Sequence, residues 1–157
     1  MDNSNRAVRL AVKYLSSRMY TKKELYDMLL RAKCGRDEAE DAVEAVAEQG
    51  YLDDYKYAEM YILDSANLNH KGEYRIRREL AQKGVSREDI DRAFLNTDAD
   101  MRGALDEYVR LRFDPESMSG YKEREKFKAQ LIRRGYSLSD INDIINEFLE
   151  TVDNVGE

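Results

Sequence analysis

The chain has 157 residues, of which 42% are hydrophobic and 37% charged, so it is long enough for one domain or several small units. This composition excludes an intrinsically disordered chain, and the single Cys excludes an internal disulfide and a cysteine-rich metal site. The net charge of −6 argues against a protein whose only task is to grip DNA, because such proteins carry a basic surplus.

The start of the chain and its apolar runs indicate where the protein is located. The sequence opens with Met-Asp-Asn-Ser-Asn-Arg, which lacks the apolar core of a signal peptide. No apolar run approaches the roughly 18 residues that a membrane-spanning helix needs. We therefore expect no membrane span and a cytoplasmic protein.

The spacing of apolar residues predicts helices throughout the chain and no β-sheet. Apolar side chains recur three and four residues apart, and no segment shows the alternation that is typical of a strand. In chain order, the predicted helices span 6–17, 22–33, 36–49, 54–68, 73–83, 87–96, 98–112, 121–134 and 138–151.

These helices form groups of three that repeat every 51 residues. Four apolar positions of the second and third helices match across all three groups without gaps. The four columns are Leu25 with Ile76 and Phe127, Leu29 with Leu80 and Leu131, Ala39 with Ile90 and Ile141, and Val43 with Phe94 and Ile145. Four such columns are hard to obtain by chance, so the chain is an array of repeats.

The repeat extends to the residues that end and begin helices. Gly84 and Gly135 share the column that suits a left-handed residue after a helix, and Lys33 takes this position in the first repeat. Capping pairs predict where three of the helices begin. These pairs are Thr21 with Glu24, Ser86 with Asp89, and Ser137 with Asp140.

The predicted fold is therefore all-α, with three tandem three-helix repeats at 1–52, 53–97 and 98–157. A triplet of short helices buries little surface by itself, so we expect neighbouring repeats to pack on one another in an elongated, curved body. The last residues, 151–157, are expected to form a frayed tail.

Few residues in the sequence could support catalysis or hold a metal. The only His, His70, lies in a polar linker, and we interpret it as a solvated loop residue. Cys34 shares an apolar column with Val85 and is interpreted as a small core residue. The carboxylate pair Asp53-Asp54 opens a helix, where capping explains it better than a metal does. We expect no catalytic residue, no metal site and no cofactor.

Basic residues gather on the middle helices of the second and third repeats, where several share columns. An arginine side chain there could bind a carboxylate or a phosphate through two parallel hydrogen bonds. For each single residue, a solvated helix face is the simpler interpretation. For the set, we expect contacts to a partner from Arg75, Arg78, Lys83, Arg133 and Arg134.

The segments 50–58, 71–85 and 131–136 resemble motifs of the RecX family of RecA regulatory proteins. Gly50 to Ala58 is similar to the family's Gly-Tyr-Leu-Asp-Asp signature, which an aromatic residue and an Ala follow. The segment 71–85 resembles its Gly-x-x-Arg-Ile-x-x-Glu-Leu-x-x-Lys-Gly motif. Leu131 to Tyr136 resembles its closing Leu-x-Arg-Arg-Gly-Phe. The order and spacing of the three segments make the resemblance stronger than any one of them does.

The resemblance implies a non-enzymatic regulator. RecX-type proteins lodge in the groove of the RecA filament on single-stranded DNA and bridge neighbouring subunits. They limit ATP hydrolysis, strand exchange and the coprotease activity that triggers the SOS response, so they act in DNA repair and recombination. ATP and magnesium would belong to RecA, and we expect this chain to be a monomer.

Two other functions remain open. The helices at 73–83 and 87–96 resemble a helix-turn-helix, which would make the chain a nucleic-acid-binding module with direct DNA contact. Glu88, Asp89 and Asp91 on the second of these helices oppose that interpretation, because they would repel phosphates. The other alternative is a generic helical-repeat scaffold for another protein.

Overall fold

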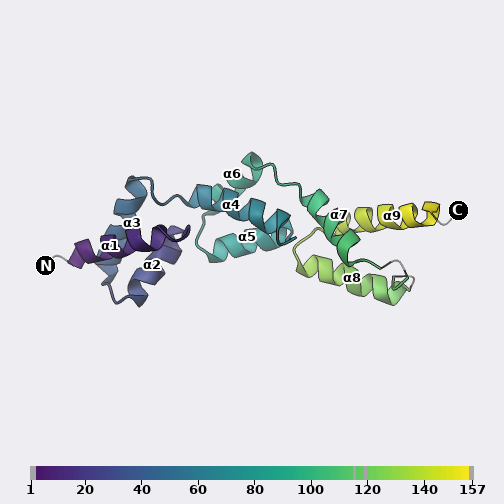
Figure 1. Cartoon of the computed structure of the whole chain (residues 1–157), viewed down its shortest axis with the longest axis horizontal. Coiled ribbons are helices and arrows are strands. Elements are labelled where there is room, and N and C mark those ends of the chain that lie inside the picture. Colours follow the sequence, from purple (N-terminus) through teal and green to yellow (C-terminus); the bar gives the residue numbers. More distant parts are fainter. Residues whose placement is uncertain (1–2, 115, 119, 156–157) are drawn as a thin grey trace. The chain divides into compact units, whose positions relative to one another are not determined.

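The structure is a computed structural model that describes residues 3–114, 116–118 and 120–155. Within these residues it contains nine α-helices and no strand, which confirms the all-helical prediction (Figure 1). The helices are α1 Asn3–Leu15, α2 Lys22–Arg31, α3 Arg36–Glu48, α4 Asp54–Asn67, α5 Glu73–Gln82, α6 Arg87–Asn96, α7 Met101–Arg112, α8 Tyr121–Arg133 and α9 Leu138–Val155.

The predicted helix ends agree closely with the observed ones, and the largest difference lies at the carboxyl end. There α9 continues to Val155, so it includes most of the segment that we expected to fray. Residues 156 and 157 of that segment lie outside the described residues. Within the described part of the chain, no helix is both long enough and apolar enough to cross a membrane.

Side-chain caps explain why α2 begins where it does. The Thr21 hydroxyl accepts a hydrogen bond from the Glu24 N–H at 3.1 Å, and the Glu24 carboxylate accepts one from the Thr21 N–H at 3.0 Å. This is the predicted capping box, and it satisfies two backbone donors that a helix start leaves free. Ser86 and Ser137 likewise accept hydrogen bonds from the N–H groups of Asp89 and Asp140, each at 3.2 Å.

The apolar columns form the core. Of the twelve side chains in the four columns, ten are buried, and Phe94 and Phe127 are half-buried. Cys34 is also buried, as predicted. One core cluster joins α1, α2 and α3, and another joins α7, α8 and α9. Burial of these side chains is the main force that holds each helix triplet together.

The chain forms two compact units that divide the second triplet. Unit 1 comprises the chain up to Met60 together with Glu79–Asn96. It contains α1–α3, the first part of α4, the last part of α5 and the whole of α6. Unit 2 holds Tyr61–Arg78 and the chain from Thr97 onward, with α7–α9. Helices α4 and α5 therefore each continue from one unit into the other.

Candidate protein-interaction surface

The five basic residues predicted from the sequence lie at the middle helices, but the structure gives them different surroundings. Arg75 and Arg78 lie on α5, Arg133 lies on α8, and Arg134 follows α8, all in unit 2. Lys83 follows α5 and belongs to unit 1. The set therefore divides into side chains that point outward and side chains that hold the fold.

Arg78 and Arg133 are the outward-pointing members of the set. Both side chains are exposed, and among the described residues neither forms a hydrogen bond or an ion pair. Arg75 is half-buried. An exposed guanidinium with all its donors available can bind a carboxylate or a phosphate of a partner without first breaking an internal contact.

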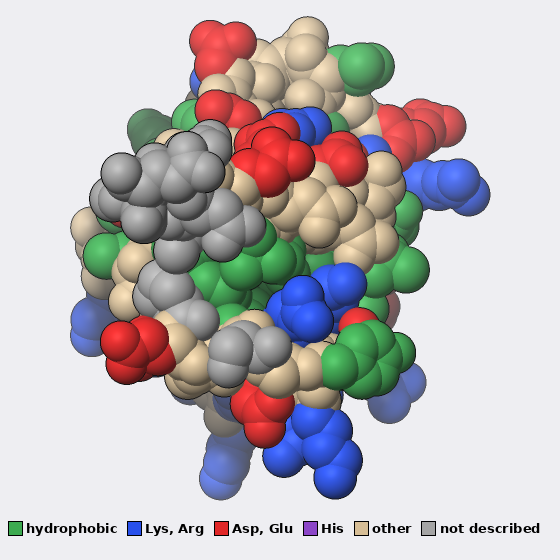
Figure 2. Space-filling view, turned by 90° about the vertical axis from the view of Figure 1, so that its right-hand side faces the viewer, with side chains coloured by type: hydrophobic (Ala, Val, Ile, Leu, Met, Phe, Trp, Pro, Cys, Tyr) green, Lys and Arg blue, Asp and Glu red, His purple; other side chains and the backbone are tan. Residues whose placement is uncertain are grey.

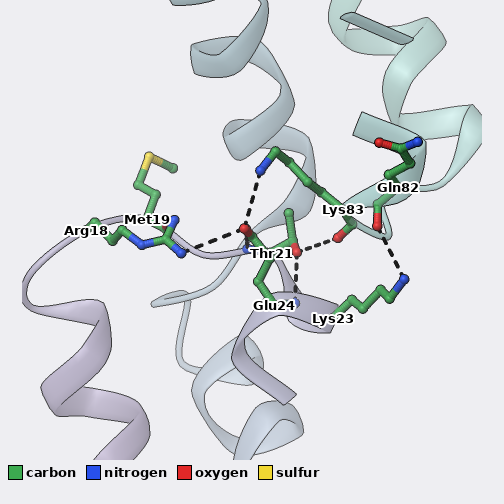
Figure 3. Close-up of polar contacts among 7 residues, drawn as sticks. All are labelled: Arg18, Met19, Thr21, Lys23, Glu24, Gln82 and Lys83. Carbon is green, nitrogen blue, oxygen red and sulfur yellow. Dashed lines mark hydrogen bonds and ion pairs between the residues drawn. The ribbon is translucent and has the colours of Figure 1, made fainter. Parts of the chain in front are cut away.

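Lys83 takes part in a polar network within unit 1, where the end of α5 meets the start of α2 (Figure 3). Its Nζ lies 3.5 Å from the Glu24 carboxylate, and its backbone carbonyl accepts a hydrogen bond from the Thr21 hydroxyl at 2.6 Å. Arg18 approaches the same carboxylate at 3.7 Å, and the Lys23 Nζ donates to the Gln82 carbonyl at 3.2 Å. The Glu24 carboxylate therefore caps the start of α2 and also pairs with Lys83, which follows α5.

The environment of Glu24 also affects the neighbouring Tyr57. Burial of the phenol, together with the negative charge of Glu24, raises the pKa of Tyr57 to about 12. The phenol therefore stays protonated across the physiological range and can donate a hydrogen bond.

Asp54 connects α4 to the same helix start. Its carboxylate accepts a hydrogen bond from the Lys22 N–H at 2.9 Å, while the neighbouring Asp53 carboxylate accepts from the Tyr55 and Lys56 N–H groups of α4. Burial raises the pKa of Asp54 above its usual value, although the Lys22 hydrogen bond opposes this shift. The pair therefore caps two different helices, of which the sequence predicted only α4.

Among the described residues, no group of side chains could hold a metal ion.

Arg134 holds a second junction, within unit 2. Its guanidinium donates to the backbone carbonyl of His70 at 3.0 Å and to that of Asn69, and it lies 4.4 Å from the Tyr108 ring centre. Its own carbonyl accepts a hydrogen bond from the Gly72 N–H at 2.8 Å. Arg134 therefore has a structural role that its position in the sequence did not reveal.

The prediction that His70 is a solvated loop residue is wrong. Its side chain is only 17% exposed, and its ring lies 5.7 Å from the Tyr108 ring, centre to centre. The Nε2 atom is 3.7 Å from a carboxylate oxygen of Glu107. Because Arg134 binds the His70 carbonyl, the polar linker is held at the end of α8, within unit 2.

The two junctions are copies of one contact at the 51-residue spacing. The Thr21 hydroxyl donates to the Lys83 carbonyl, and the Gly72 N–H donates to the Arg134 carbonyl. The two donors are 51 residues apart in the sequence, and so are the two acceptors. We call residues 21–24 and 72–75 the receiving turns, and residues 82–85 and 133–136 the docking loops. In each unit, the start of one middle helix receives the loop that ends the next middle helix.

Glycine is required in the docking loops for a second reason besides ending the helix. Gly84 and Gly135 adopt φ values of 90° and 100°, as the predicted helix ends require. A Cβ on Gly84 would lie 2.5 Å from the Lys23 Cβ, and a Cβ on Gly135 would lie 2.5 Å from the Arg75 Cβ. The receiving turn and the docking loop therefore approach too closely for any side chain at these positions.

A groove of about 510 Å³ runs along α8 in unit 2. Lys126, Phe127, Gln130 and Arg133 line it from the helix, and Met118 lines it from the preceding segment. We call it the α8 groove. On the face that Figure 2 shows, hydrophobic side chains gather in the middle, and both basic and acidic side chains lie around them. An apolar core with a polar rim is typical of a protein–protein interface.

Comparisons with known proteins agree with the resemblance seen in the sequence. The family model described as the first three-helix domain of RecX matches residues 7–44, and the one described as its second three-helix domain matches residues 53–93.

Similar proteins span nearly the whole chain. The regulatory protein RecX of Shigella dysenteriae is 32% identical over 150 residues, which are 89% of this chain and 90% of that protein. The Cronobacter sakazakii protein of the same name is 31% identical over 154 residues, or 92% of this chain and 93% of that protein.

Solved structures share the fold. The crystal structure of RecX from Lactobacillus salivarius matches with a TM-score of 0.81 and 26% identity, covering 96% of this chain and 98% of that chain. A second crystal structure of a regulatory protein RecX matches with a TM-score of 0.77 and 25% identity, covering 92% of this chain and 72% of that chain.

Proposed function

This chain belongs to the RecX family of regulatory proteins, and we propose that it binds the RecA filament on single-stranded DNA and inhibits its activities. The observation that carries the proposal is coverage. The match to RecX relatives extends over about nine tenths of both chains, so a whole regulator is matched and not one shared module. The proposed effects are slower ATP hydrolysis, less strand exchange and less coprotease activity.

We propose that this regulator acts as a monomer in the cytoplasm and has no catalytic activity of its own. ATP and magnesium would be bound by RecA. An array of repeats suits this role because several weak contacts on neighbouring filament subunits add up to a high overall affinity.

Arg78 and Arg133 are the side chains that we propose as the main contacts to the filament. Their guanidinium groups are exposed and have no internal partner among the described residues, so binding requires no rearrangement of the fold. Arg75, Lys83 and Arg134 remain in the proposed set. Lys83 and Arg134 also hold the junctions, so substitutions there would alter stability as well as binding.

The test is the DNA-dependent ATPase activity of cognate RecA, titrated with this protein on single-stranded DNA. We expect inhibition at well below one molecule per RecA subunit. The charge reversal Arg78→Glu with Arg133→Glu should raise the concentration needed for half-inhibition at least tenfold, because the new carboxylates repel the groups that the guanidiniums bind.

A matched control separates local contacts from net charge. Arg9 on α1 and Arg36 on α3 are also exposed, so Arg9→Glu with Arg36→Glu changes the net charge equally. It should leave inhibition within about twofold of the unmodified protein. A flat titration with confirmed filaments would sink the proposed function and favour a scaffold for another protein. Salt-sensitive binding to DNA without RecA would favour the nucleic-acid-binding module.

A further inference from the structure

The receiving turns have a third counterpart on α8. At the 51-residue spacing, residues 21–24 and 72–75 correspond to residues 123–126. In the first two repeats this position is covered by a docking loop, whereas on α8 it lies at the α8 groove. The exposure of Phe127 fits this difference, because its ring is half-buried while Leu25 and Ile76 in the same column are fully buried.

The internal junctions show which kind of segment fits such a position. In both of them the occupant is the carboxyl-terminal end of a helix, which offers backbone carbonyls to the start of the receiving helix. The two helix ends complement each other, since a helix start carries partial positive charge and a helix end carries partial negative charge.

The charges in the α8 groove differ from those in unit 1. Lys126 stands in the column of Glu24, the carboxylate that pairs with Lys83 of the docking loop. Arg133 lies two helical turns further along, which places the two cations about 10 Å apart along the helix axis. Glu123 also lines the groove, at the end nearest the start of α8. The second receiving turn has Arg75 in this column, and there the basic Arg134 binds the Asn69 and His70 carbonyls instead of a carboxylate. An occupant with a carboxylate at this position would be attracted to Lys126.

A second copy of this chain does not provide such an occupant. The remaining loop of the docking type follows α2, and there Lys33 carries a Cβ at the position where Gly84 and Gly135 leave no room for one. In addition, the Arg6 guanidinium already donates to the Ala32 carbonyl at 2.9 Å, which is the counterpart of the carbonyls of Lys83 and Arg134.

We infer that the α8 groove binds the carboxyl-terminal end of a helix of a partner protein, with an acidic side chain where the internal docking loops carry Lys83 or Arg134. Phe127 and Met118 provide the apolar floor, and Lys126 and Arg133 bind the carboxylate and the free carbonyls. The inference deepens the proposed function, on which it rests only for the identity of the partner.

The test uses two stapled helical peptides, whose helicity is first checked by circular dichroism. Both end in the segment Leu80 to Ser86, one with the natural Lys83 and the other with Lys83→Glu. Binding of each labelled peptide to the full chain is measured by fluorescence anisotropy at low salt. We expect the Glu peptide to bind at least tenfold more tightly than the Lys peptide.

A charge swap in the groove makes the test specific. The variant Lys126→Glu with Arg133→Glu should reverse the preference, so that it binds the Lys peptide more tightly than the Glu peptide. The Arg9→Glu, Arg36→Glu variant should bind both peptides as the unmodified chain does. Equal binding of the two peptides, or no binding of either helical peptide at millimolar concentration, would overturn the inference.

The two proposals fail separately. If the protein inhibits RecA but shows no preference between the peptides, the groove inference is wrong and the proposed function stands. If the peptides behave as expected but RecA is unaffected, the groove is a docking site for another partner.

Discussion

Lys33, which follows α2, adopts a backbone conformation that favours glycine. Its φ is 67°, and it holds the column that Gly84 and Gly135 occupy in the other repeats. For a residue with a Cβ the left-handed conformation costs roughly 1–2 kcal/mol. The side chain is exposed, so its loss would remove no packing.

The substitution Lys33→Gly should therefore stabilise the protein. Relief of the backbone strain exceeds the extra entropy of an unfolded glycine, and we expect a net gain of about 0.5–1 kcal/mol. Thermal unfolding followed by circular dichroism measures the gain. Lys33→Ala is the control, since it removes the charge and keeps the Cβ. An equal gain in the Ala variant would show that strain is not the cause.

Asp54 combines a useful hydrogen bond with a poorly solvated charge. Asp54→Asn keeps an oxygen that can accept from the Lys22 N–H, so stability should change by less than about 0.5 kcal/mol. Asp54→Ala removes the acceptor and should cost about 1 kcal/mol. Urea unfolding measures both values, and equal losses in the two variants would show that the hydrogen bond contributes nothing.

The stability contribution of Asp54 also depends on pH. Because burial raises its pKa in the folded state, the folded protein binds this proton more tightly than the unfolded chain does. The cost of the buried charge therefore applies above the folded pKa and diminishes as the pH falls through it. Asp54→Asn should lack this relative gain on mild acidification, and urea unfolding at neutral and mildly acidic pH measures the difference.

Helix boundaries were the most predictable elements because local residues fix them. The start of α2 was predicted at the observed residue because the Thr21 and Glu24 capping box lies entirely in the local sequence. The end of α9 was predicted four residues early, at 151, although the sequence has no Gly or Pro between Leu138 and Gly156 that would stop the helix there. The sequence predicted that Gly135 ends a helix, because that signal is local. It did not predict that Gly135 lies against Arg75, because these two residues are sixty positions apart in the chain.

Alanine substitutions at three glycines separate these two roles. Gly50, Gly84 and Gly135 all have positive φ, but a Cβ on Gly50 would meet no atom within 4 Å. Gly50→Ala should cost about 1 kcal/mol from backbone strain alone. Gly84→Ala and Gly135→Ala should cost more, and Gly135→Ala most, because its Cβ would also lie 2.5 Å from the Arg75 backbone nitrogen. Equal losses by urea unfolding at all three positions would contradict the close approach.

For the molecule as a whole, the sequence revealed the repeats but not the contacts between them. In the receiving turns the donor is a Thr21 hydroxyl in one copy and the Gly72 N–H in the other, so no shared side chain marks the contact. Arg134 was recognisable as a cation, but its direction toward the Asn69 and His70 carbonyls was not. The division into two compact units within α4 and α5 also has no signal in composition or charge.

Hydrogen exchange can test whether each compact unit depends on its own junction. Gly84→Ala should raise amide exchange in the first turn of α2, which receives its loop, and leave the first turn of α5 unchanged. Gly135→Ala should have the opposite pattern. Mass spectrometry of the exchanged protein measures both, and a uniform rise across the chain in either variant would contradict separate junctions.

The conformation of Lys33 has a consequence for how such a chain can evolve. Tandem arrays lengthen by gene duplication, and a new copy inserted before α1 would have to receive the loop that follows α2. The Lys33 Cβ and the Arg6 contact to the Ala32 carbonyl would both keep that loop from docking. The added copy would then be joined to α1 by the backbone without packing on the first repeat. Growth toward the amino terminus would therefore need both a glycine at position 33 and the loss of the Arg6 contact before a longer array could pack and be selected.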